Sequence, residues 1–243
     1  MIALHKNLKT VDTRKAILAT LFVCFAFVFR IFKRFALKLQ TVAQLFDFYV
    51  FARITLNTKV FPNRETLYNL ILSDITENAG IHHTFLEFGV AQGYTTHYFS
   101  SRLDKSKIEY KYYGFDTFLG LPQDWRNFKK GSFTNEGNPP SLKSTNVEFF
   151  KGFVQDTLPV FLESKLRTRT KTEKFIILFD LDLLSPTRFC FDSIMPFLLS
   201  GDLLYFDEAF DVGERSIIEE LMNENKEIEI IAASIQSLLI RKK

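Results

Sequence analysis

Acidic residues follow four apolar stretches of this chain, at the points where short strands are expected to end. They are Glu87, Asp116, Asp180 and the adjacent pair Asp207 and Glu208. In a mostly parallel sheet the carboxyl ends of the strands lie at one edge, and ligands bind there. One acid at such a position would be ordinary, but five acids at four strand ends predict a binding or catalytic site. Carboxylates can accept hydrogen bonds from ligand hydroxyls or coordinate a hard metal ion.

Residues 85–96, FLEFGVAQGYTT, predict a short buried strand that ends in a glycine turn and leads into a helix. Because glycine has no Cβ, the backbone of such a turn can approach a nucleotide closely. The next expected strand, residues 110–115, ends in Asp116, which is placed to accept hydrogen bonds from ribose hydroxyls. Residues 85–116 therefore predict half of a nucleoside-binding α/β domain. The alternative is an ordinary strand–turn–helix unit with a tight turn.

The spacing of the glycines narrows the class of ligand. A dinucleotide-binding turn has the pattern Gly-x-Gly-x-x-Gly, whose middle glycine lets the backbone contact a pyrophosphate. Here Val-Ala-Gln separates Gly89 from Gly93, so that the middle glycine is missing, and Glu87 would repel a phosphate. This argues against a nicotinamide-dependent oxidoreductase. S-adenosylmethionine fits better, because it has a ribose, a sulfonium and an amino acid tail but no phosphate.

Strand-like and helix-like stretches alternate after residue 116. The expected strands lie at residues 147–151, 175–179, 203–206, 228–233 and 238–242, and the last two predict a β-hairpin. Such alternation is typical of a mostly parallel sheet with helices on both faces. Residues 117–146 interrupt it with a long irregular insert that contains the single tryptophan, Trp125. A connection of this length is usually functional, and we expect it to act as a lid.

The N-terminal 43 residues carry eight Lys or Arg residues and one Asp, a charge of +7, whereas the other 200 residues sum to −4. A nucleic-acid enzyme would carry its basic face on the catalytic domain, so no nucleic-acid partner is expected. Residues 16–29 are an unbroken apolar run between basic residues. Even counted to residue 32 it is short for a membrane span of about 20 residues. Residues 16–32 therefore predict a helix that lies on an anionic membrane surface. The alternative is a helix that packs on the domain or across a homodimer.

Length, composition and cysteine content limit the class of protein to which this chain can belong. A chain of 243 residues suits one α/β domain plus an extension, and a hydrophobic fraction of 47% is too low for a polytopic membrane protein. Cys24 and Cys190 are far apart and show no zinc-ligand spacing. We therefore expect a reduced, cytoplasmic protein, attached to the inner face of a membrane if its N-terminal helix binds lipid.

Five ordered motifs resemble the macrocin O-methyltransferase (TylF-like) family of class I S-adenosylmethionine-dependent methyltransferases. They are FLEFGVAQG, YYGFDTFLGLPQDWR, FFKGFVQDTLP, FDLDLLSPT and YFDEAF, at residues 85–93, 112–126, 149–159, 179–187 and 205–210. The second is the most specific, because the family shows a closely similar Gly-Phe-Asp-Ser/Thr-Phe-x-Gly-Leu-Pro run. The resemblance covers roughly residues 64–242. It implies a Rossmann-like seven-stranded, mostly parallel sheet with an antiparallel last strand, helices on both faces and an N-terminal helical extension.

The resemblance also implies roles for particular residues. Residues 64–243 would form the methyltransferase domain, with the lid-like insert at 117–146, and residues 1–63 a basic, hydrophobic helical extension. The residues expected to bind S-adenosylmethionine are Glu87, Gly89, Gly93, Asp116, Gly152 and Asp156. The family usually binds magnesium through acids after the fourth and fifth strands, which here are Asp180, Asp207 and Glu208. Oxygen ligands without a Cys/His cluster suit Mg²⁺.

The expected reaction is methyl transfer to a hydroxyl of a sugar, a glycan or a natural product. Asp180 would act through the metal, and Asp182 would lie on the same side of the extended chain as a candidate base. Two positions depart from the family pattern, since Leu184 and Ala209-Phe210 stand where tyrosines are usual. The alternative function is therefore a non-catalytic S-adenosylmethionine-binding protein with a degenerate acceptor site.

Overall fold

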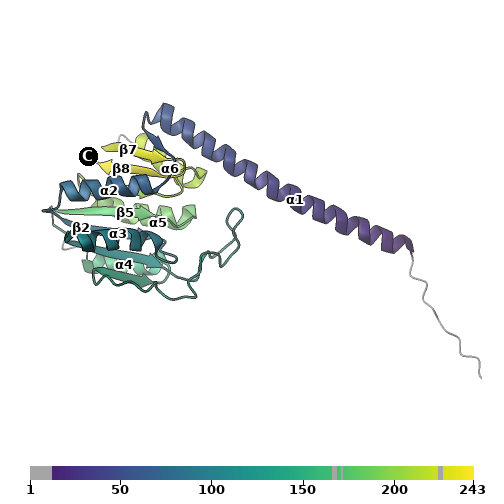
Figure 1. Cartoon of the computed structure of the whole chain (residues 1–243), viewed down its shortest axis with the longest axis horizontal. Coiled ribbons are helices and arrows are strands. Elements are labelled where there is room, and N and C mark those ends of the chain that lie inside the picture. The colour runs from purple at the N-terminus through teal and green to yellow at the C-terminus, as the bar shows by residue number, and fades with distance from the viewer. Residues whose placement is uncertain (1–12, 166–168, 171, 224–226) are drawn as a thin grey trace, which may run out of the picture. The chain divides into compact units, whose positions relative to one another are not determined.

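The computed structural model describes residues 13–165, 169–170, 172–223 and 227–243. Two compact units make up the chain, residues 1–42 and residues 43–243. Lys6 and Lys9, which contribute to the expected basic tail, lie outside the described residues. Figure 1 shows the helices and strands with the labels used below.

A single mixed sheet forms the centre of the second unit (Figure 1). Its strands are β1 (Val60–Phe61), β2 (His82–Phe88), β3 (Tyr110–Asp116), β4 (Val147–Lys151), β5 (Glu173–Phe179), β6 (Leu203–Phe206), β7 (Ile228–Ser234) and β8 (Leu238–Lys242). They lie in the order β1-β7-β8-β6-β5-β2-β3-β4. The last strand, β8, is antiparallel to β6 and β7, and the other neighbours are parallel. The predicted Rossmann-like architecture and terminal hairpin are confirmed.

The described sheet has eight strands rather than the seven expected. The additional strand is β1, whose two residues pair with Ala233 and Ser234 of β7. Two residues are too few to show the alternation by which a strand is recognised in a sequence. The pairing nevertheless matters for the site, because it fixes the chain just before Arg64.

Helices cover both faces of the sheet. They are α2 (Glu65–Glu77), α3 (Tyr94–Ser106), α4 (Val154–Lys165), α5 (Leu184–Ile194) and α6 (Val212–Asn223), with short turns at η1 (Phe51–Thr55) and η3 (Met195–Phe197). Side chains alternate along β5: Phe175, Ile177 and Phe179 pack in a core with α4, α5 and α6. Ile176 and Leu178 pack in a second core with α2 and α3. This two-sided burial makes β5 a continuous apolar run.

The start of α5 differs from the sequence expectation. Ser185 and Pro186 suggest an N-cap followed by the first helical residue. The helix instead begins at Leu184, after Leu183 in an extended conformation and without a side-chain capping hydrogen bond. The loop between β5 and α5, residues 180–183, is therefore two residues shorter than expected and includes Asp182 at a positive φ of 61°.

The helix α1 (Thr13–Val50) contains 38 residues. Its large apolar side chains that are more than half exposed are Leu21, Phe22, Val23, Phe25, Phe27, Val28, Phe29, Ile31, Phe32, Phe35, Leu39, Val42 and Phe46. None of the helices in the described part of the chain is long and apolar enough to cross a membrane. The last turns of α1 belong to the second unit, where Phe48 is fully buried in the core that contains α4, α5 and α6.

Candidate functional site

The glycine turn after β2 is a point of close backbone approach. Gly89 has a φ of +91°, and a Cβ at this position would lie 1.7 Å from the carbonyl oxygen of Asp180. The amide of Gly89 donates to the carbonyl of Phe115 (3.0 Å), and the amide of Asp180 donates to Phe88 (2.8 Å). Because the end of β5 lies so close to this turn, only glycine fits at position 89, whether or not a ligand is bound. The residues around Gly89 gave no sign of this approach, because Asp180 lies far along the chain.

The insert packs on the same turn. Gly93, at a φ of +79°, immediately precedes α3, and a Cβ there would lie 2.7 Å from Cγ of Pro140. The insert thus contacts the turn that is expected to hold the cofactor. Within the insert, Trp125 and Phe128 exchange backbone hydrogen bonds (3.0 and 2.8 Å), and their rings are stacked. The ring centroids of Phe133 and Phe128 lie 4.6 Å apart, so that this part of the insert contains an aromatic cluster.

Asp116 connects the glycine turn after β2 to the insert. Its Oδ2 accepts hydrogen bonds from the amides of Val90 (2.8 Å) and Ala91 (2.7 Å), and its Oδ1 accepts one from the amide of Phe118 (2.7 Å). The carboxylate therefore ties the glycine turn to the first residues of the insert. Oδ2 accepts two hydrogen bonds, whereas Oδ1 accepts one and has a second lone pair with which it could accept a hydrogen bond from a ribose hydroxyl.

The other residues expected at the cofactor lie in different surroundings. Glu87 is 1% exposed, between β2 and α3, where its Oε2 accepts hydrogen bonds from Thr96 and from Tyr112 (3.0 Å). Burial raises the pKa of Glu87 to about 8. Gly152 lies beside Asp116, since its amide donates to the Asp116 carbonyl (3.0 Å). Asp156 is exposed in the first turn of α4.

Four carboxyl groups gather beyond the ends of β5 and β6. They are Asp180, Asp182, Asp207 and Glu208. Burial, and then the charges of Asp207 and Asp182, raise the pKa of Asp180 well above its ordinary value. Burial and Asp207 raise the pKa of Asp182 to about 7, and burial, Asp207 and Asp182 raise that of Glu208 to about 9. The structure therefore brings together three of the five acids that were predicted from their strand ends, Asp180, Asp207 and Glu208, and adds Asp182 to them.

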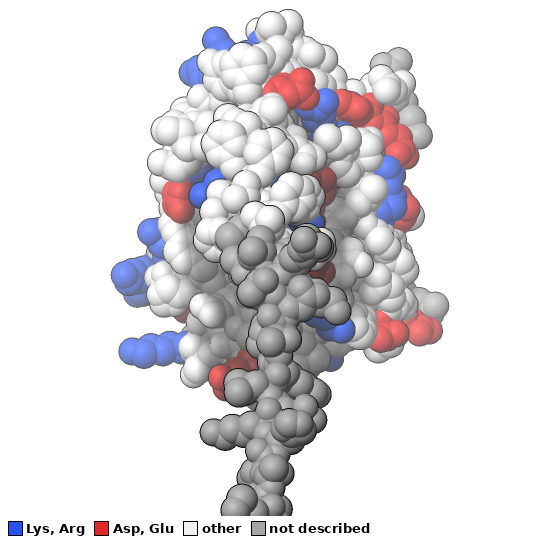
Figure 2. All heavy atoms as spheres, turned by 90° about the vertical axis from the view of Figure 1, so that its right-hand side faces the viewer, with Lys and Arg blue, Asp and Glu red and all other residues white. Residues whose placement is uncertain are grey.

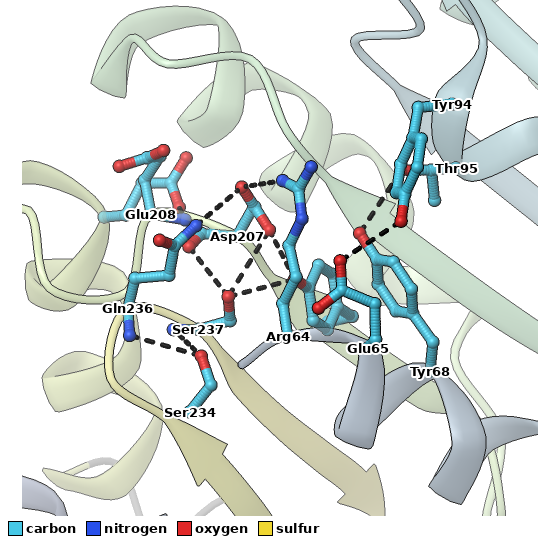
Figure 3. Close-up of polar contacts among 12 residues, drawn as sticks. Arg64, Glu65, Tyr68, Tyr94, Thr95, Asp207, Glu208, Ser234, Gln236 and Ser237 are labelled. Carbon is cyan, nitrogen blue, oxygen red and sulfur yellow. Dashed lines mark hydrogen bonds and ion pairs between the residues drawn. The ribbon is translucent and has the colours of Figure 1, made fainter. Parts of the chain in front are cut away.

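The two neighbouring acids of β6 have different partners. Asp207 is 2% exposed, and its carboxylate accepts hydrogen bonds from Arg64 Nη1 (2.9 Å), Ser237 Oγ (3.3 Å), Gln236 Nε2 (3.4 Å) and the hydroxyl of Tyr205 (Figure 3). Glu208 is 8% exposed, and its Oε2 is buried without a hydrogen-bond partner. An unpaired buried carboxylate oxygen is costly unless a ligand or ion satisfies it.

Glu214, from the first turn of α6, contacts the backbone of Glu208. It accepts hydrogen bonds from Thr187 Oγ1 (3.1 Å) and from the amide of Glu208 (3.2 Å). The side chain is 2% exposed, and burial raises its pKa to about 8. Glu214 thus fixes the backbone of Glu208 and brings a fifth carboxyl group to this edge of the sheet.

Sequence reasoning missed two arginines, of which Arg64 contacts this group of acids and Arg126 contacts Asp211, which follows it in the chain. Arg64, immediately before α2, pairs with Asp207, and its guanidinium carbon lies 5.6 Å from the centroid of the Tyr94 ring (Figure 3). Arg126, from the insert, pairs with Asp211 (2.7 Å) and lies 4.0 Å from the centroid of the Phe210 ring. Arg126 ends the most specific sequence motif, which was a usable signal, whereas nothing in the sequence around Arg64 indicated a role.

The acids have the donor chemistry of a magnesium site but are not arranged as one. Across the described ranges, no three His, Cys, Asp or Glu side chains are grouped so that they could hold a metal ion. The cation that contacts Asp207 is the guanidinium of Arg64. On the face shown in Figure 2, acidic and basic side chains lie interspersed among uncharged ones.

Comparison with known proteins supports the fold. Neither a protein-family model nor a curated protein matches the chain. The structure of CalS11, a calicheamicin methyltransferase, superposes with a TM-score of 0.57 at 20% identity, over 74% of this chain and 80% of that one. The O-methyltransferase NovP gives a TM-score of 0.53 at 15% identity, over 71% of this chain and 76% of NovP. At these identities the likeness establishes a fold shared with methyltransferases.

Proposed function

We propose that this chain is an S-adenosylmethionine-dependent O-methyltransferase that acts on a hydroxyl group of a sugar, a glycan or another natural product. The proposal rests on two features that lie at the same edge of the sheet. The glycine turn with Asp116 lies on one side, and the carboxyl groups after β5 and β6 lie on the other. A second structure of CalS11, described as a TDP-rhamnose 3'-O-methyltransferase, superposes with a TM-score of 0.50 at 21% identity.

The two sides of this sheet edge would have different roles, one in binding the cofactor and the other in binding the metal. Residues on the cofactor side, Glu87, Gly89, Gly93, Asp116, Gly152 and Asp156, would shape the S-adenosylmethionine pocket. Asp180, Asp207 and Glu208 would hold Mg²⁺, for which carboxylate oxygens are the preferred ligands. Bound magnesium would lower the pKa of the acceptor hydroxyl and orient it. The unpartnered Oε2 of Glu208 supports a cation at this place.

Asp182 is proposed to accept the proton of the acceptor hydroxyl. It lies in the same group of acids, and its positive φ of 61° is unusual for a residue other than glycine. We assign residues 64–243 to the methyltransferase domain, residues 117–146 to a lid and residues 1–63 to an N-terminal extension. The contact of Arg126 with Asp211 supports the lid, because it joins the insert to the residue whose amide donates to the carbonyl of Glu208.

A non-catalytic S-adenosylmethionine-binding protein is the second candidate. Leu184 is 43% exposed and Phe210 only 6% exposed, at positions where related sequences are expected to present tyrosine hydroxyls. Methyl transfer from labelled S-adenosylmethionine to a panel of sugars and glycosides, with and without Mg²⁺, separates the two. Binding of the cofactor without any transfer would favour the second candidate.

Replacement of Asp116 tests the cofactor side. Asp116→Ala is expected to weaken S-adenosylmethionine binding by about 1–3 kcal/mol, because the turn loses an acceptor for two amides and the ribose loses a charged partner. Isothermal titration calorimetry measures the affinity. The control is Asp192→Ala, which removes a carboxylate that is 61% exposed on α5. Equal affinity of the Asp116 variant and the control would remove Asp116 from the cofactor site.

The exposed apolar surface of α1 supports a membrane partner. Between residues 13 and 46 the helix contains basic residues and no acid. Each basic residue near an anionic lipid surface contributes about 1 kcal/mol, and the apolar side chains add burial. The full chain is therefore expected to co-sediment with anionic vesicles and to leave them in high salt.

Two controls define this test. Zwitterionic vesicles should retain less protein, and a protein that begins at residue 43 should remain in the supernatant with unchanged cofactor affinity. If the full chain ignores vesicles, and removal of residues 1–42 instead splits a homodimer, α1 is an interface between copies of this chain and the membrane proposal is wrong.

A further inference from the structure

We infer that the acceptor is an amphiphile, a sugar-bearing molecule with an alkyl tail, and that its tail lies on an exposed apolar surface beside the group of acids. The centre of this surface, called the tail surface below, is formed by Leu184 and Val212, the first residues of α5 and α6. The inference rests on the proposed function, because it names the class of molecule whose hydroxyl group would be methylated.

Leu184 and Val212 come together although they belong to different helices. A Cβ on Gly213 would lie 3.0 Å from Cβ and 3.7 Å from Cδ2 of Leu184, so the start of α6 packs against this leucine. Val212 immediately precedes Gly213, and Leu184 and Val212 are 43% and 61% exposed. Single exposed apolar residues are common on proteins, but neighbouring ones from two elements form a patch that a ligand can cover.

The backbone connects the tail surface to the group of acids at two points. Asp182 lies two positions before Leu184, in the loop that precedes α5. Val212 directly follows Asp211, whose amide donates to the carbonyl of Glu208 (2.7 Å). A hydroxyl group held at Asp182 would therefore bring the rest of the acceptor within reach of Leu184 and Val212.

The last turns of α1, which belong to the same compact unit, lie next to α6. Arg215 is three residues after Val212, so the two side chains are neighbours on the helix. Nη1 of Arg215 pairs with Asp47 of α1 (2.5 Å), and its guanidinium carbon lies 5.2 Å from the centroid of the Phe51 ring. The helix that is proposed to bind a membrane thus ends beside α6, which favours an acceptor that is itself held in a membrane over a free sugar.

The chemistry of Leu184 also favours a tailed acceptor. This leucine stands where a tyrosine was expected, and that departure suggested a degenerate acceptor site. Leucine cannot donate a hydrogen bond, but its burial under an alkyl chain is favourable. A free sugar needs polar partners and would leave Leu184 and Val212 uncovered. The replacement is then a change in the class of acceptor and not the loss of the acceptor site.

The test compares octyl β-D-glucopyranoside, below its micelle-forming concentration, with methyl β-D-glucopyranoside, which has the same sugar and no tail. Binding to the full chain is followed by the fluorescence of Trp125, the single tryptophan of the sequence. Its neighbour Arg126 pairs with Asp211 (2.7 Å), next to Val212, so this fluorescence should respond to a ligand on the tail surface. The octyl glucoside is expected to bind at least about tenfold tighter than the methyl glucoside, because its additional methylene groups leave water.

Two variants locate the tail, and a third is their control. Leu184→Ser and Val212→Ser should each bind the octyl glucoside at least about fivefold more weakly than wild type, while affinity for the methyl glucoside stays within about twofold. Val160→Ser on α4 should leave both affinities unchanged, because Val160 is 65% exposed, close to the 61% of Val212, but lies on another helix. Thermal unfolding checks that the variants fold. If Leu184→Ser does not, the comparison of Val212→Ser with Val160→Ser decides.

Methyl transfer to the methyl and octyl glycosides of a panel of sugars separates the inference from the proposed function. A higher kcat/KM for an octyl glycoside, lowered in Val212→Ser and not in Val160→Ser, supports both. Equal kcat/KM for methyl and octyl glycosides leaves the proposed function in place and overturns the inference. Weaker octyl binding by the two variants without transfer to any glycoside supports the tail surface and counts against the proposed function. If neither glucoside changes the fluorescence of Trp125, or if all four proteins bind the octyl glucoside equally, the inference is wrong.

Discussion

Gly89→Val is expected to destabilise the folded domain by at least about 3 kcal/mol and to abolish S-adenosylmethionine binding. The Cβ of any other residue would lie 1.7 Å from the carbonyl oxygen of Asp180, which no side-chain rearrangement can relieve. The ends of β2 and β5 would have to separate, and Asp180 would move with them. Chemical denaturation measures the loss of stability, and calorimetry measures the loss of binding.

Two other glycines serve as matched controls for Gly89. Gly131 has a positive φ of +84° and open space where its Cβ would be, so Gly131→Val carries the backbone strain without the collision. Gly80 also faces open space, and no positive φ accompanies it. Gly89→Val should therefore be the most destabilised of the three, with Gly131→Val intermediate. Wild-type stability in Gly89→Val would show that the two strand ends do not meet as described.

Gly89 also illustrates what could be predicted from the sequence and what could not. The strand, the turn and the helix were recognisable from the pattern of apolar residues and glycines. The reason for the glycine was not, because the atom that excludes a side chain belongs to Asp180, 91 positions later. A local pattern carries information about local geometry, whereas contacts between strands depend on the order of the sheet.

In the candidate site, too, some features could be predicted from the sequence and others could not. The acids were predicted to meet because parallel strands end at one edge, and the charge of Asp207 does raise the pKa of Asp180, Asp182 and Glu208. The arginines that pair beside them were missed. Arg64 is 143 positions from Asp207 and Arg126 is 85 positions from Asp211, so no spacing rule connects either pair.

Asp180→Asn is expected to lower the rate of methyl transfer at least about a hundredfold while cofactor affinity stays within about twofold of wild type. Asparagine keeps the size of the side chain but removes the charge that would bind the metal. The substitution should not unfold the protein, because burial and the charges of Asp207 and Asp182 already disfavour the ionised form of Asp180. Asp192→Asn, on the exposed surface of α5, is the matched control.

Removal of the metal should reproduce the effect of this substitution. With EDTA, wild type is expected to fall to the activity of Asp180→Asn, whereas the variant should change little, because both treatments remove the same cation from the acceptor hydroxyl. Addition of Mg²⁺ should restore wild type and not the variant. Full wild-type activity in EDTA, together with an inactive Asp180→Asn, would contradict the metal. The group of acids would then act on the acceptor without it, through direct hydrogen bonds to the hydroxyl group.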